Sequence, residues 1–313
     1  MSGFKVIAPG VLSLIQDLGR FGKGTLGLTN GGPLDPSSAF WANRLLQNDA
    51  NASLIECTVG GLRLQAQVAS YIAVTGAELP LTINGKAAAL WTTLAVRAGD
   101  IIELGMASKG LRAYIAVAGG FSVTPQFGST ATVLREQIGG LNGSKLQAGD
   151  MLQAAAITGL SKISLPAAYR PQFNKVLTLR LIEGYQAAQF SDVERQRFYL
   201  NPYHVTPQAD RMGYKLSGSA ISCQQRKLLS EGICYGAAQI PPDGQPIVLL
   251  NDRQTLGGYP KIGSVLSLDG ALLAQAGAGT EVYFTPVTVE LAHHALCLAQ
   301  VRFKAIATQL VTV

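Results

Sequence analysis

Charge is scarce in this chain, and the charge that is present does not cluster. Charged residues make up 14% of the 313 residues, and the formal net charge is +6. The lysines and arginines are scattered, with no basic run and no basic face interleaved with aromatic residues. We therefore expect no nucleic-acid partner. Mild basicity instead suits a surface that attracts small anionic ligands.

Histidine and cysteine are also few, which limits metal and redox chemistry. The three histidines include His293 and His294, adjacent in an expected helix, where side chains point about 100° apart, so we expect no metal site. His204 is the best candidate for acid–base chemistry, although a structural role is the simpler interpretation. The four cysteines show no CxxC spacing and fit free thiols in a reducing compartment. They are Cys57, Cys223, Cys234 and Cys297.

Long apolar runs are missing as well. No window approaches about 18 uninterrupted apolar residues, so no membrane-spanning helix is expected. The first ten residues have no long apolar core and meet Pro9 at once, which argues against a signal peptide. We expect a cytoplasmic protein without a membrane partner.

The familiar catalytic signatures are absent. Residues 19–25 resemble a phosphate-binding loop, but the required earlier glycine is missing and Gly24 follows Lys23 in place of serine or threonine. Residues 140–145 fail in a similar way. The chain has no GxSxG or HExxH motif, no dinucleotide fingerprint after a strand, and no biotin-attachment lysine between methionines. It therefore resembles one part of a catalyst whose other parts lie elsewhere.

Hydrophobic residues, glycine and proline are plentiful by contrast. Hydrophobic residues make up 48% of the chain, which also contains 35 glycines and 14 prolines. This composition favours short strands and turns over helix bundles. A chain this long supports two cores, since a single core stops growing near about 250–300 residues. We expect three helices: residues 36–47 after the N-cap Asp35, a short helix opened by a capping box of Ser191 and Glu194, and residues 289–309.

The second half of the chain repeats the first at an offset of 175 residues (182 − 7 = 175), which drifts to 180 near the end. A period this long indicates a duplicated domain and excludes a solenoid. We predict an all-β protein of two tandem β-barrels with a few short helices, because closing a barrel hides the edges of many short strands. The expected domains are residues 1–165 and 166–313, joined within residues 161–174. The matched pairs are Ile7 with Ile182, Asp35 with Asp210, Glu56 with Glu231, Gly61 with Gly236, Ile72 with Ile247 and Lys86 with Lys261.

Polar and turn-forming residues are most dense in residues 230–263, on both sides of the apolar strand 246–250. Pro241 and Pro242 fix a tight turn, while Gly257 and Gly258 let the backbone approach a ligand closely. Donors and acceptors at the mouth of a buried strand are typical of a polar small-molecule site. A polar hairpin with solvated turns is the alternative interpretation.

In and near this segment we predict two catalytic residues. Arg211 offers a bidentate fork to an anion, and Asp252 is the candidate general base or water-positioning group. The alternative is that Arg211 merely pairs with Asp210 or another nearby carboxylate. Lys261 is expected to offset phosphate charge, unless it is structural like Lys86 in the first half. The predicted substrate-binding residues are Gln239, Gln245, Gln254, Thr255, Gly257, Gly258, Tyr259 and Lys261.

Several collinear motifs carry a family resemblance. QDLGRFG (residues 16–22), GGPLD (31–35), IECTVGG (55–61), DRMGYKLSG (210–218) and QIPPDGQPIVLLNDRQTLGGYPKIG (239–263) resemble the biotin-dependent carboxyltransferase-like family, which includes the allophanate hydrolase subunit 2 domain. The resemblance covers nearly the whole chain. It implies two tandem cyclophilin-like β-barrels and a related partner chain, the B subunit of such assemblies.

Within this family a separate chain of this length is most similar to the C subunit of bacterial 5-oxoprolinase. That resemblance implies a complex with the A and B subunits that uses ATP to hydrolyse 5-oxo-L-proline to L-glutamate, with this chain inactive alone. It does not imply which of the three chains binds ATP. Two alternatives stay open: a biotin-dependent carboxyltransferase acting on urea or a similar acceptor, and a regulatory binding protein.

Overall fold

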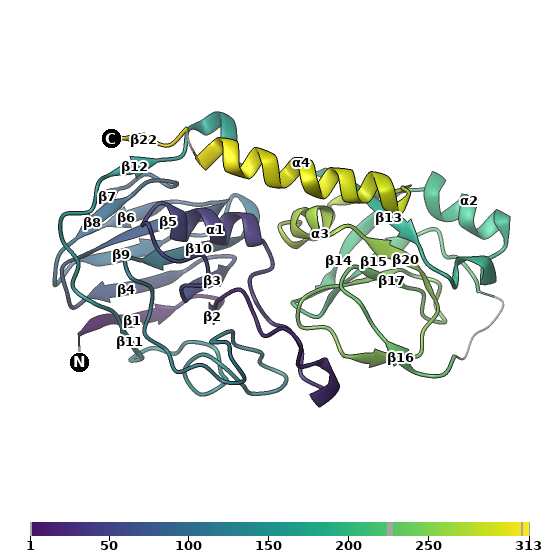
Figure 1. The fold of residues 1–313 in the computed structure, drawn as a ribbon, viewed down its shortest axis with the longest axis horizontal. Coiled ribbons are helices and arrows are strands. Elements are labelled where there is room, and N and C mark those ends of the chain that lie inside the picture. Colours follow the sequence, from purple (N-terminus) through teal and green to yellow (C-terminus); the bar gives the residue numbers. More distant parts are fainter. Residues whose placement is uncertain (1, 224–227, 308, 313) are drawn as a thin grey trace. The chain divides into compact units, whose positions relative to one another are not determined.

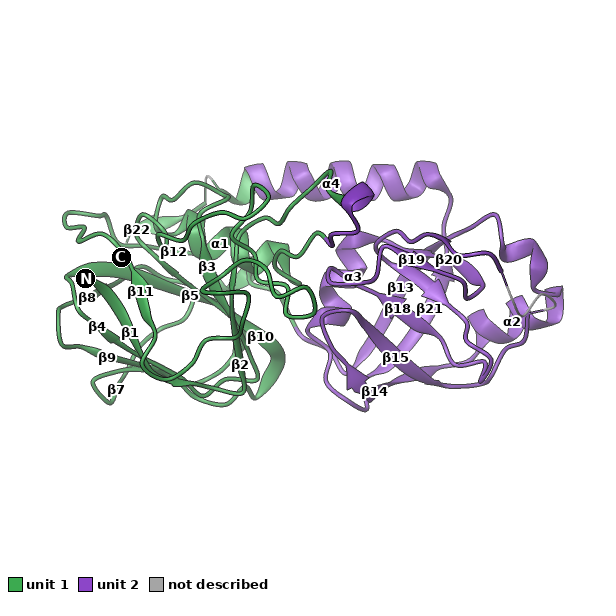
Figure 2. Cartoon of the chain, turned by 90° about the horizontal axis from the view of Figure 1, so that it is seen from below, with its two compact units in different colours: residues 1–23, 30–172, 305–313 green, residues 24–29, 173–304 purple. Residues whose placement is uncertain are grey.

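The computed structural model describes residues 2–223, 228–307 and 309–312. The chain forms two compact units, coloured separately in Figure 2. The first unit comprises residues 1–23, 30–172 and 305–313, and the second comprises residues 24–29 and 173–304. The described residues are mostly β-structure with four α-helices, as expected from the composition. Within these described ranges, no helix combines the length and the apolar character that crossing a membrane requires.

The first unit is built from two antiparallel sheets, with strand orders β11-β1-β4-β9-β6-β7 and β2-β3-β10-β5-β8 (Figure 1). Both sheets contribute to one core, in which Phe4 and Leu64 of the first sheet and Ile55 and Val74 of the second are fully buried. The strands of the first sheet are β1 (Gly3–Pro9), β4 (Leu62–Ala66), β6 (Leu81–Ile83), β7 (Lys86–Ala87), β9 (Ile101–Leu104) and β11 (Met151–Gln153). Those of the second are β2 (Leu12–Gln16), β3 (Leu54–Thr58), β5 (Ser70–Glu78), β8 (Leu94–Val96) and β10 (Lys109–Val117).

Helix α1 (Pro36–Arg44) covers the second sheet of this unit. Its Ala42 packs in a separate buried cluster with Ala73 and Ala116, which lie on β5 and β10. The Asp35 carboxylate accepts a 3.0 Å hydrogen bond from the Ser38 backbone N–H, so the predicted N-cap is confirmed. A short pair of strands, β12 (Ile163–Ser164) and β22 (Val311–Thr312), completes the unit.

The QDLGRFG stretch has a structural role in the first unit. The Asp17 carboxylate accepts hydrogen bonds from Ser129 Oγ at 2.5 Å, the Thr130 N–H at 2.6 Å and the Gly19 N–H at 2.9 Å. Gln16 Nε2 donates to the Thr132 carbonyl at 3.1 Å. These bonds fasten the loop around residues 129–132 to the end of strand β2.

Seven strands of the second unit form a closed barrel in the order β13-β20-β17-β18-β15-β14-β21. The barrel closes through the parallel pair β13 and β21, and its other neighbours are antiparallel. Tyr214, Leu216 and Val248 are fully buried in it. The strands are β13 (Val176–Glu183), β14 (Tyr203–Ala209), β15 (Gly213–Gly218), β17 (Ala237–Gln239), β18 (Ile247–Leu249), β20 (Lys261–Val265) and β21 (Glu281–Pro286).

Outside the barrel, β16 (Glu231–Gly232) and β19 (Leu256–Gly257) pair with each other as a short antiparallel ribbon. Ile233, which follows the ribbon, packs against Ala237 of β17 and Leu249 of β18. The ribbon therefore lies beside the outer face of these two barrel strands.

Two of the predicted helices of the second unit are confirmed and one helix was missed. Helix α2 (Asp192–Leu200) begins at the predicted cap, where Ser191 Oγ accepts from the Glu194 N–H at 3.3 Å, and α4 (Val289–Ala307) matches the expected C-terminal helix. Helix α3 (Ser267–Ala274) was not predicted. It is eight residues long, contains a glycine and has no side-chain N-cap bond, so local sequence gives little signal.

The interpretation of an internal duplication into two tandem barrels is not confirmed. Apart from the short β12–β22 pair, the strands of the first unit lie in two open sheets, and among the described residues only the second unit shows a closed barrel. The 175-residue offset moves helix α1 onto residues 211–219 (36 + 175 = 211), where strand β15 lies. Strand β1 pairs with β4, yet their offset counterparts β13 and β17 are separated by β20. Identities among glycines, acids and apolar strand residues reflect shared turn and strand chemistry as readily as common descent.

Candidate functional site

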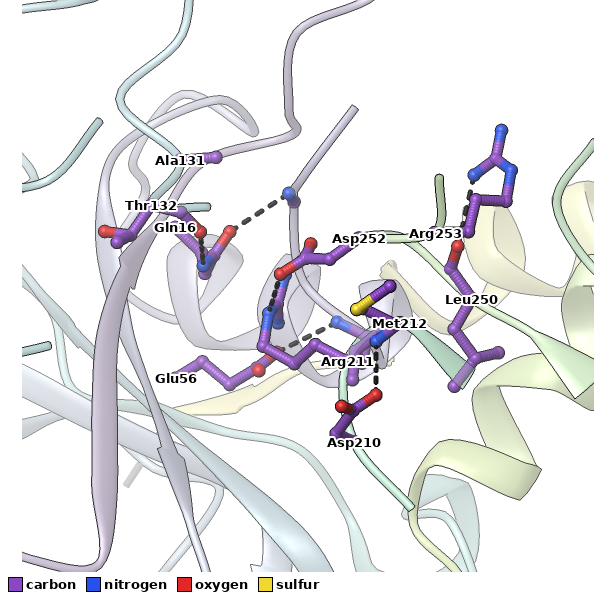
Figure 3. A network of polar contacts seen from close by, with 12 residues as sticks. Gln16, Glu56, Ala131, Thr132, Asp210, Arg211, Met212, Leu250, Asp252 and Arg253 are labelled. Atoms are coloured by element: carbon purple, nitrogen blue, oxygen red, sulfur yellow. Dashed lines mark hydrogen bonds and ion pairs between the residues drawn. The ribbon is translucent and has the colours of Figure 1, made fainter. Parts of the chain in front are cut away.

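Arg211 and Asp252 meet in a buried ion pair in the second unit (Figure 3). Each residue is 5% exposed. Arg211 Nε donates to Asp252 Oδ2 at 2.8 Å, and Nη2 donates to Oδ1 at 2.9 Å. This fork-to-fork geometry is the strongest form of a side-chain ion pair. The two predicted catalytic residues are therefore neighbours.

The backbone around the barrel explains why these side chains meet. Arg211 lies in the turn between β14 and β15, and Asp252 lies just after β18. Beyond the β15–β18 ladder, the Leu250 N–H donates to the Met212 carbonyl at 2.8 Å and the Asp252 N–H donates to the Arg211 carbonyl at 3.0 Å. The Asp210 carboxylate holds the turn by accepting from the Met212 N–H at 2.7 Å (Figure 3).

This geometry bears on the roles predicted for the pair. Both carboxylate oxygens of Asp252 accept from one guanidinium, so proton abstraction by Asp252 would require breaking the pair. An arginine held in this way presents a fixed positive charge. The arrangement favours Asp252 as the residue that positions Arg211. It also matches the alternative interpretation, in which Arg211 pairs with a nearby carboxylate.

A cleft of about 510 Å³ lies on the outer face of the same barrel strands. Its volume is in the range of small-molecule sites. Three of the predicted substrate-binding residues line it: Gln239, Gln254 and Tyr259. Neither of the predicted catalytic residues, Arg211 and Asp252, is among the described residues that line it. The other walls come from residues 207–210, Met212, Gly213, Lys215, Ile247 and Leu249. A smaller cleft of about 190 Å³, between α2 and the Pro241–Gly244 turn, includes none of the predicted site residues.

Gln239 is the most buried of the predicted residues in the large cleft. It is 2% exposed, and among the described residues its Nε2 has no hydrogen-bond partner. Gly257 lies against it, since a Cβ added there would be 3.1 Å from Gln239 Nε2 and 2.4 Å from Ile233 Cδ1. The absence of a side chain at Gly257 therefore gives the Gln239 amide its space.

Lys261 belongs to a different cluster, on the ribbon side of the barrel. Its ammonium pairs with Glu231, and its backbone N–H donates to Gln186 Oε1 at 2.7 Å. Tyr185 also donates to Glu231, and Gln186 Nε2 donates to Glu231 Oε1 at 2.7 Å. Hydrogen bonds from Lys261 and then Tyr185 lower the pKa of the Glu231 carboxyl below its ordinary value. The Lys261 charge is thus met by a carboxylate of this chain.

The remaining predicted residues hold the backbone. Gln245 exchanges hydrogen bonds with Gly218, accepting from its N–H at 2.8 Å and donating to its carbonyl at 3.2 Å. The Thr255 carbonyl accepts from the Ile233 N–H at 3.0 Å. A Cβ added at Gly258 would lie 3.0 Å from the Leu228 carbonyl oxygen. Each of these contacts shapes the segment around the cleft without lining it.

No group of three or more metal-ligating side chains gathers anywhere in the ranges that the structure describes. The four cysteines are free thiols, and burial raises the pKa of Cys57. In the cleft, Lys215 is paired with Asp243, Nζ to Oδ2 at 2.6 Å, and this bond lowers the pKa of the Asp243 carboxyl.

With this geometry established, comparison with known proteins identifies the family. Residues 26–286 match the family model described as the carboxyltransferase domain, subdomain A and B. This chain belongs to that family. The family resemblance of the sequence motifs is therefore confirmed.

Two bacterial members of the carboxyltransferase domain family are similar along almost their whole length. The C subunit of 5-oxoprolinase from Escherichia coli is 36% identical over 91% of this chain and 92% of its own length. The protein of the same name from Haemophilus influenzae is 37% identical over 88% of each chain.

Two solved structures share the fold within longer chains. The crystal structure of TTHA0988 has a TM-score of 0.82 and 34% identity over 91% of this chain, and this chain spans 56% of its length. The urea carboxylase of Kluyveromyces lactis has a TM-score of 0.90 and 25% identity over 97% of this chain, which spans 29% of that enzyme.

Sequence reasoning missed the partners that surround its candidates. Lys215 was not singled out, although the alternation of buried Tyr214 and Leu216 places it on the outer face of β15. Glu231 was noted only as a repeat match, and its bonds to Tyr185 and Lys261 depend on contacts between distant segments. No local sequence pattern predicts such contacts.

Proposed function

We propose that this chain is the C subunit of an ATP-dependent 5-oxoprolinase, and that with its partner subunits it hydrolyses 5-oxo-L-proline to L-glutamate. The observation that carries the proposal is the similarity to two proteins named as the C subunit of 5-oxoprolinase, at 36% and 37% identity along about nine-tenths of each chain. The cyclophilin-like character of both units is part of the same proposal.

The chemistry explains why such an enzyme uses ATP. The five-membered lactam is an unstrained, resonance-stabilised amide, and phosphorylation of its carbonyl oxygen makes water a sufficient nucleophile. Developing negative charge then needs a fixed cation. In this proposal Arg211, which is held by Asp252 and lies in the chain between the lining residues Asp210 and Met212, supplies such a charge, while Gln239, Gln254 and Tyr259 contact uncharged atoms of the substrate.

The proposal assigns the chain to a complex. The A and B subunits of 5-oxoprolinase are the expected partners, with the B subunit in direct contact, and the chain alone is expected to be inactive. ATP acts in the complex, and biotin is not attached to this chain.

Reconstitution tests the proposal. The purified A and B subunits are mixed with this chain, and L-glutamate released from 5-oxo-L-proline is measured with and without ATP. Release that requires ATP and all three chains supports the proposal. Unchanged release when this chain is left out, or none in the full mixture, would contradict it.

Carboxyl transfer is the second candidate, favoured by the TM-score of 0.90 to urea carboxylase. It requires a biotin carrier and a biotin carboxylase from other chains. Adding both, with bicarbonate, ATP and urea, to the same partner mixture discriminates between the two candidates. Carboxylation of urea without glutamate release would favour this second function.

A further inference from the structure

Gln239 carries a buried side-chain amide at the edge of the large cleft. It is 2% exposed, lines the 510 Å³ cleft, and its Nε2 finds no hydrogen-bond partner in the described part of the chain. A buried donor left without an acceptor is costly, and native proteins rarely keep one without a reason. Nε2 itself is shielded from solvent in this structure, so the amide would have to turn toward the cleft, where a bound ligand that offers an acceptor atom would remove the cost.

Strand pairing shows what lies beside this amide. Lys215 of β15 is paired with Ile247 of β18, which is paired in turn with Gln239 of β17. Residues paired across neighbouring strands lie on the same face of a sheet, so these three form one row on the cleft floor. The ladder of β17 and β20 shifts register between Ala238 and Gln239, and irregularities of this kind re-aim side chains.

The row sets an amide at one end and an ammonium at the other, with an apolar residue between them. The side chains of Gln239 and Lys215 are both long, and their strands are two spacings apart, about 10 Å. A small ring with an amide on one side and a carboxylate on the other matches this order. Its apolar carbons would lie over Ile247.

The charges of the cleft fit a lactam better than a nucleotide. In the described lining, the charged side chains are Lys215 and Asp210, and Lys215 also forms an ion pair with Asp243. A triphosphate needs several donors or cations aimed at its oxygens. A primary amide, by contrast, carries both a donor and an acceptor and pairs with the N–H and C=O of a cis amide.

We propose that this cleft binds the lactam edge of a small cyclic amide, with the Gln239 amide as the specificity-determining contact and Lys215 directed at the carboxylate of the ligand. This inference rests on the proposed function, because that function supplies a lactam as the substrate. It adds that the second unit of this chain holds the subsite.

Ligand binding to the purified full chain tests the proposal, with saturation-transfer NMR as the measurement. The probes are 5-oxo-L-proline, 2-pyrrolidinone, which keeps the lactam and lacks the carboxylate, and cyclopentanecarboxylate, which lacks the amide. We expect both lactams to bind, 5-oxo-L-proline more tightly. A site built to hydrogen-bond an amide rejects an analogue that lacks one. Equal binding of cyclopentanecarboxylate, or no binding of either lactam, would overturn the assignment.

Variants of the full chain locate the contact. Gln239→Glu keeps the shape of the side chain and removes its donor, so the affinity for both lactams should fall at least about tenfold. Gln67→Glu makes the same chemical change at an exposed position of the first unit and should leave affinity unchanged. Lys215→Met should lower the affinity for 5-oxo-L-proline and leave the affinity for 2-pyrrolidinone unchanged. Undiminished lactam binding by a folded Gln239→Glu chain would refute the proposal.

The inference and the proposed function fail in different ways. If the reconstituted complex releases glutamate but Gln239→Glu has no effect on lactam binding or on KM, the function stands and the subsite lies elsewhere. If the chain binds lactams through Gln239 but no mixture of the three chains releases glutamate, the subsite stands and the function is wrong.

Discussion

Arg211 and Asp252 hold each other in a bidentate ion pair, Nε to Oδ2 at 2.8 Å and Nη2 to Oδ1 at 2.9 Å, with both residues 5% exposed. Taking one partner away leaves the other charge buried. Because removing one partner of a buried ion pair is costly, Asp252→Ala should lower the free energy of unfolding by about 3–5 kcal/mol in urea titrations.

An exposed pair in the first unit provides the control. Lys109 and Glu78 lie 3.3 Å apart with side chains 62% and 51% exposed, so Glu78→Ala should cost about 1 kcal/mol or less. The double variant Arg211→Met with Asp252→Leu should recover part of the loss, since it removes both charges of the pair together. Equal losses for Asp252→Ala and Glu78→Ala would contradict the inference that burial dominates.

Measurements of activity distinguish the two roles considered for Asp252, which are positioning Arg211 and acting as the general base. In the reconstituted complex, Arg211→Ala should lower kcat by about 10²–10³-fold, because the proposed function places this fixed charge near the reacting atoms. Asp252→Asn should lower kcat less than Arg211→Ala does. It should also leave the acidic limb of the pH–rate profile in place, as expected of a positioning residue. Loss of that acid limb in Asp252→Asn would instead identify Asp252 as the general base.

The Glu231 cluster predicts a pH dependence of stability. Hydrogen bonds from Lys261 and Tyr185 lower the pKa of Glu231 from its ordinary value of 4.5. A carboxyl whose pKa is depressed by folding stabilises the fold above its unfolded pKa, and this contribution is lost as the pH falls through the folded pKa. Glu231→Gln should therefore differ most from the parent above pH 4.5 and converge with it below. The effect is modest because the Glu231 side chain is 34% exposed.

Urea midpoints measured between about pH 3 and pH 6 check this. Glu103, an exposed carboxylate 3.7 Å from Arg63 in the first unit, is the matched position. Glu103→Gln should change the free energy of unfolding little, because an exposed ion pair contributes little to stability. A Glu231→Gln curve that runs parallel to that of the parent would show that the cluster contributes no pH-dependent stability.

Asp17 should be a stability residue despite its place in a family motif. Its carboxylate accepts three hydrogen bonds, from the Gly19 and Thr130 N–H groups and from Ser129 Oγ. Asp17→Ala leaves these donors without an acceptor and should lower the free energy of unfolding by about 3 kcal/mol. Asp49→Ala, at an exposed aspartate that accepts one bond from the Asn51 N–H, should cost about 1 kcal/mol or less. If Asp17→Ala instead keeps full stability and loses activity, the motif is catalytic.

Local signals in the sequence predict the parts of the fold that local chemistry decides. Helices α1 and α2 begin at Asp35 and Ser191 because these side chains cap nearby N–H groups. Helix α3 escaped prediction because a distant strand holds it: Asp269, in its first turn, accepts from the N–H of Arg180 on β13 at 2.7 Å and from its Nη2 at 2.6 Å. The barrel closes through β13 and β21, which pair Val176 with Glu281, and no short pattern specifies a pairing that distant.

In the candidate site, too, local sequence predicts some features, while others depend on contacts between distant segments. The dense polar segment identified Gln239, Gln254 and Tyr259, which line the cleft, together with Gln245, which binds Gly218. Composition does not separate these glutamines, because the direction of each side chain depends on strand register. Gln239 is opposite Ile247 in the ladder, and Gln245 lies in the turn before it.

Two glycines of the β16–β19 ribbon offer a matched test of the cleft. A Cβ at Gly257 would lie 3.1 Å from Gln239 Nε2 and 2.4 Å from Ile233 Cδ1, whereas a Cβ at Gly232, on the neighbouring strand, would meet nothing within 4 Å. Neither glycine has a positive φ, so alanine brings no backbone strain at either position. The two substitutions thus differ only in what the new methyl group meets.

Gly257→Ala should push the Gln239 amide from its position and weaken 5-oxo-L-proline binding by about tenfold, with a similar rise in KM of the reconstituted complex. Gly232→Ala should leave both unchanged. Melting temperatures measured on the same samples separate loss of the fold from loss of the subsite, since Ile233 is able to turn its terminal methyl aside. Equal affinity in the two folded variants would mean that the space around Gln239 does not control binding, and that Gly257 serves only the ribbon.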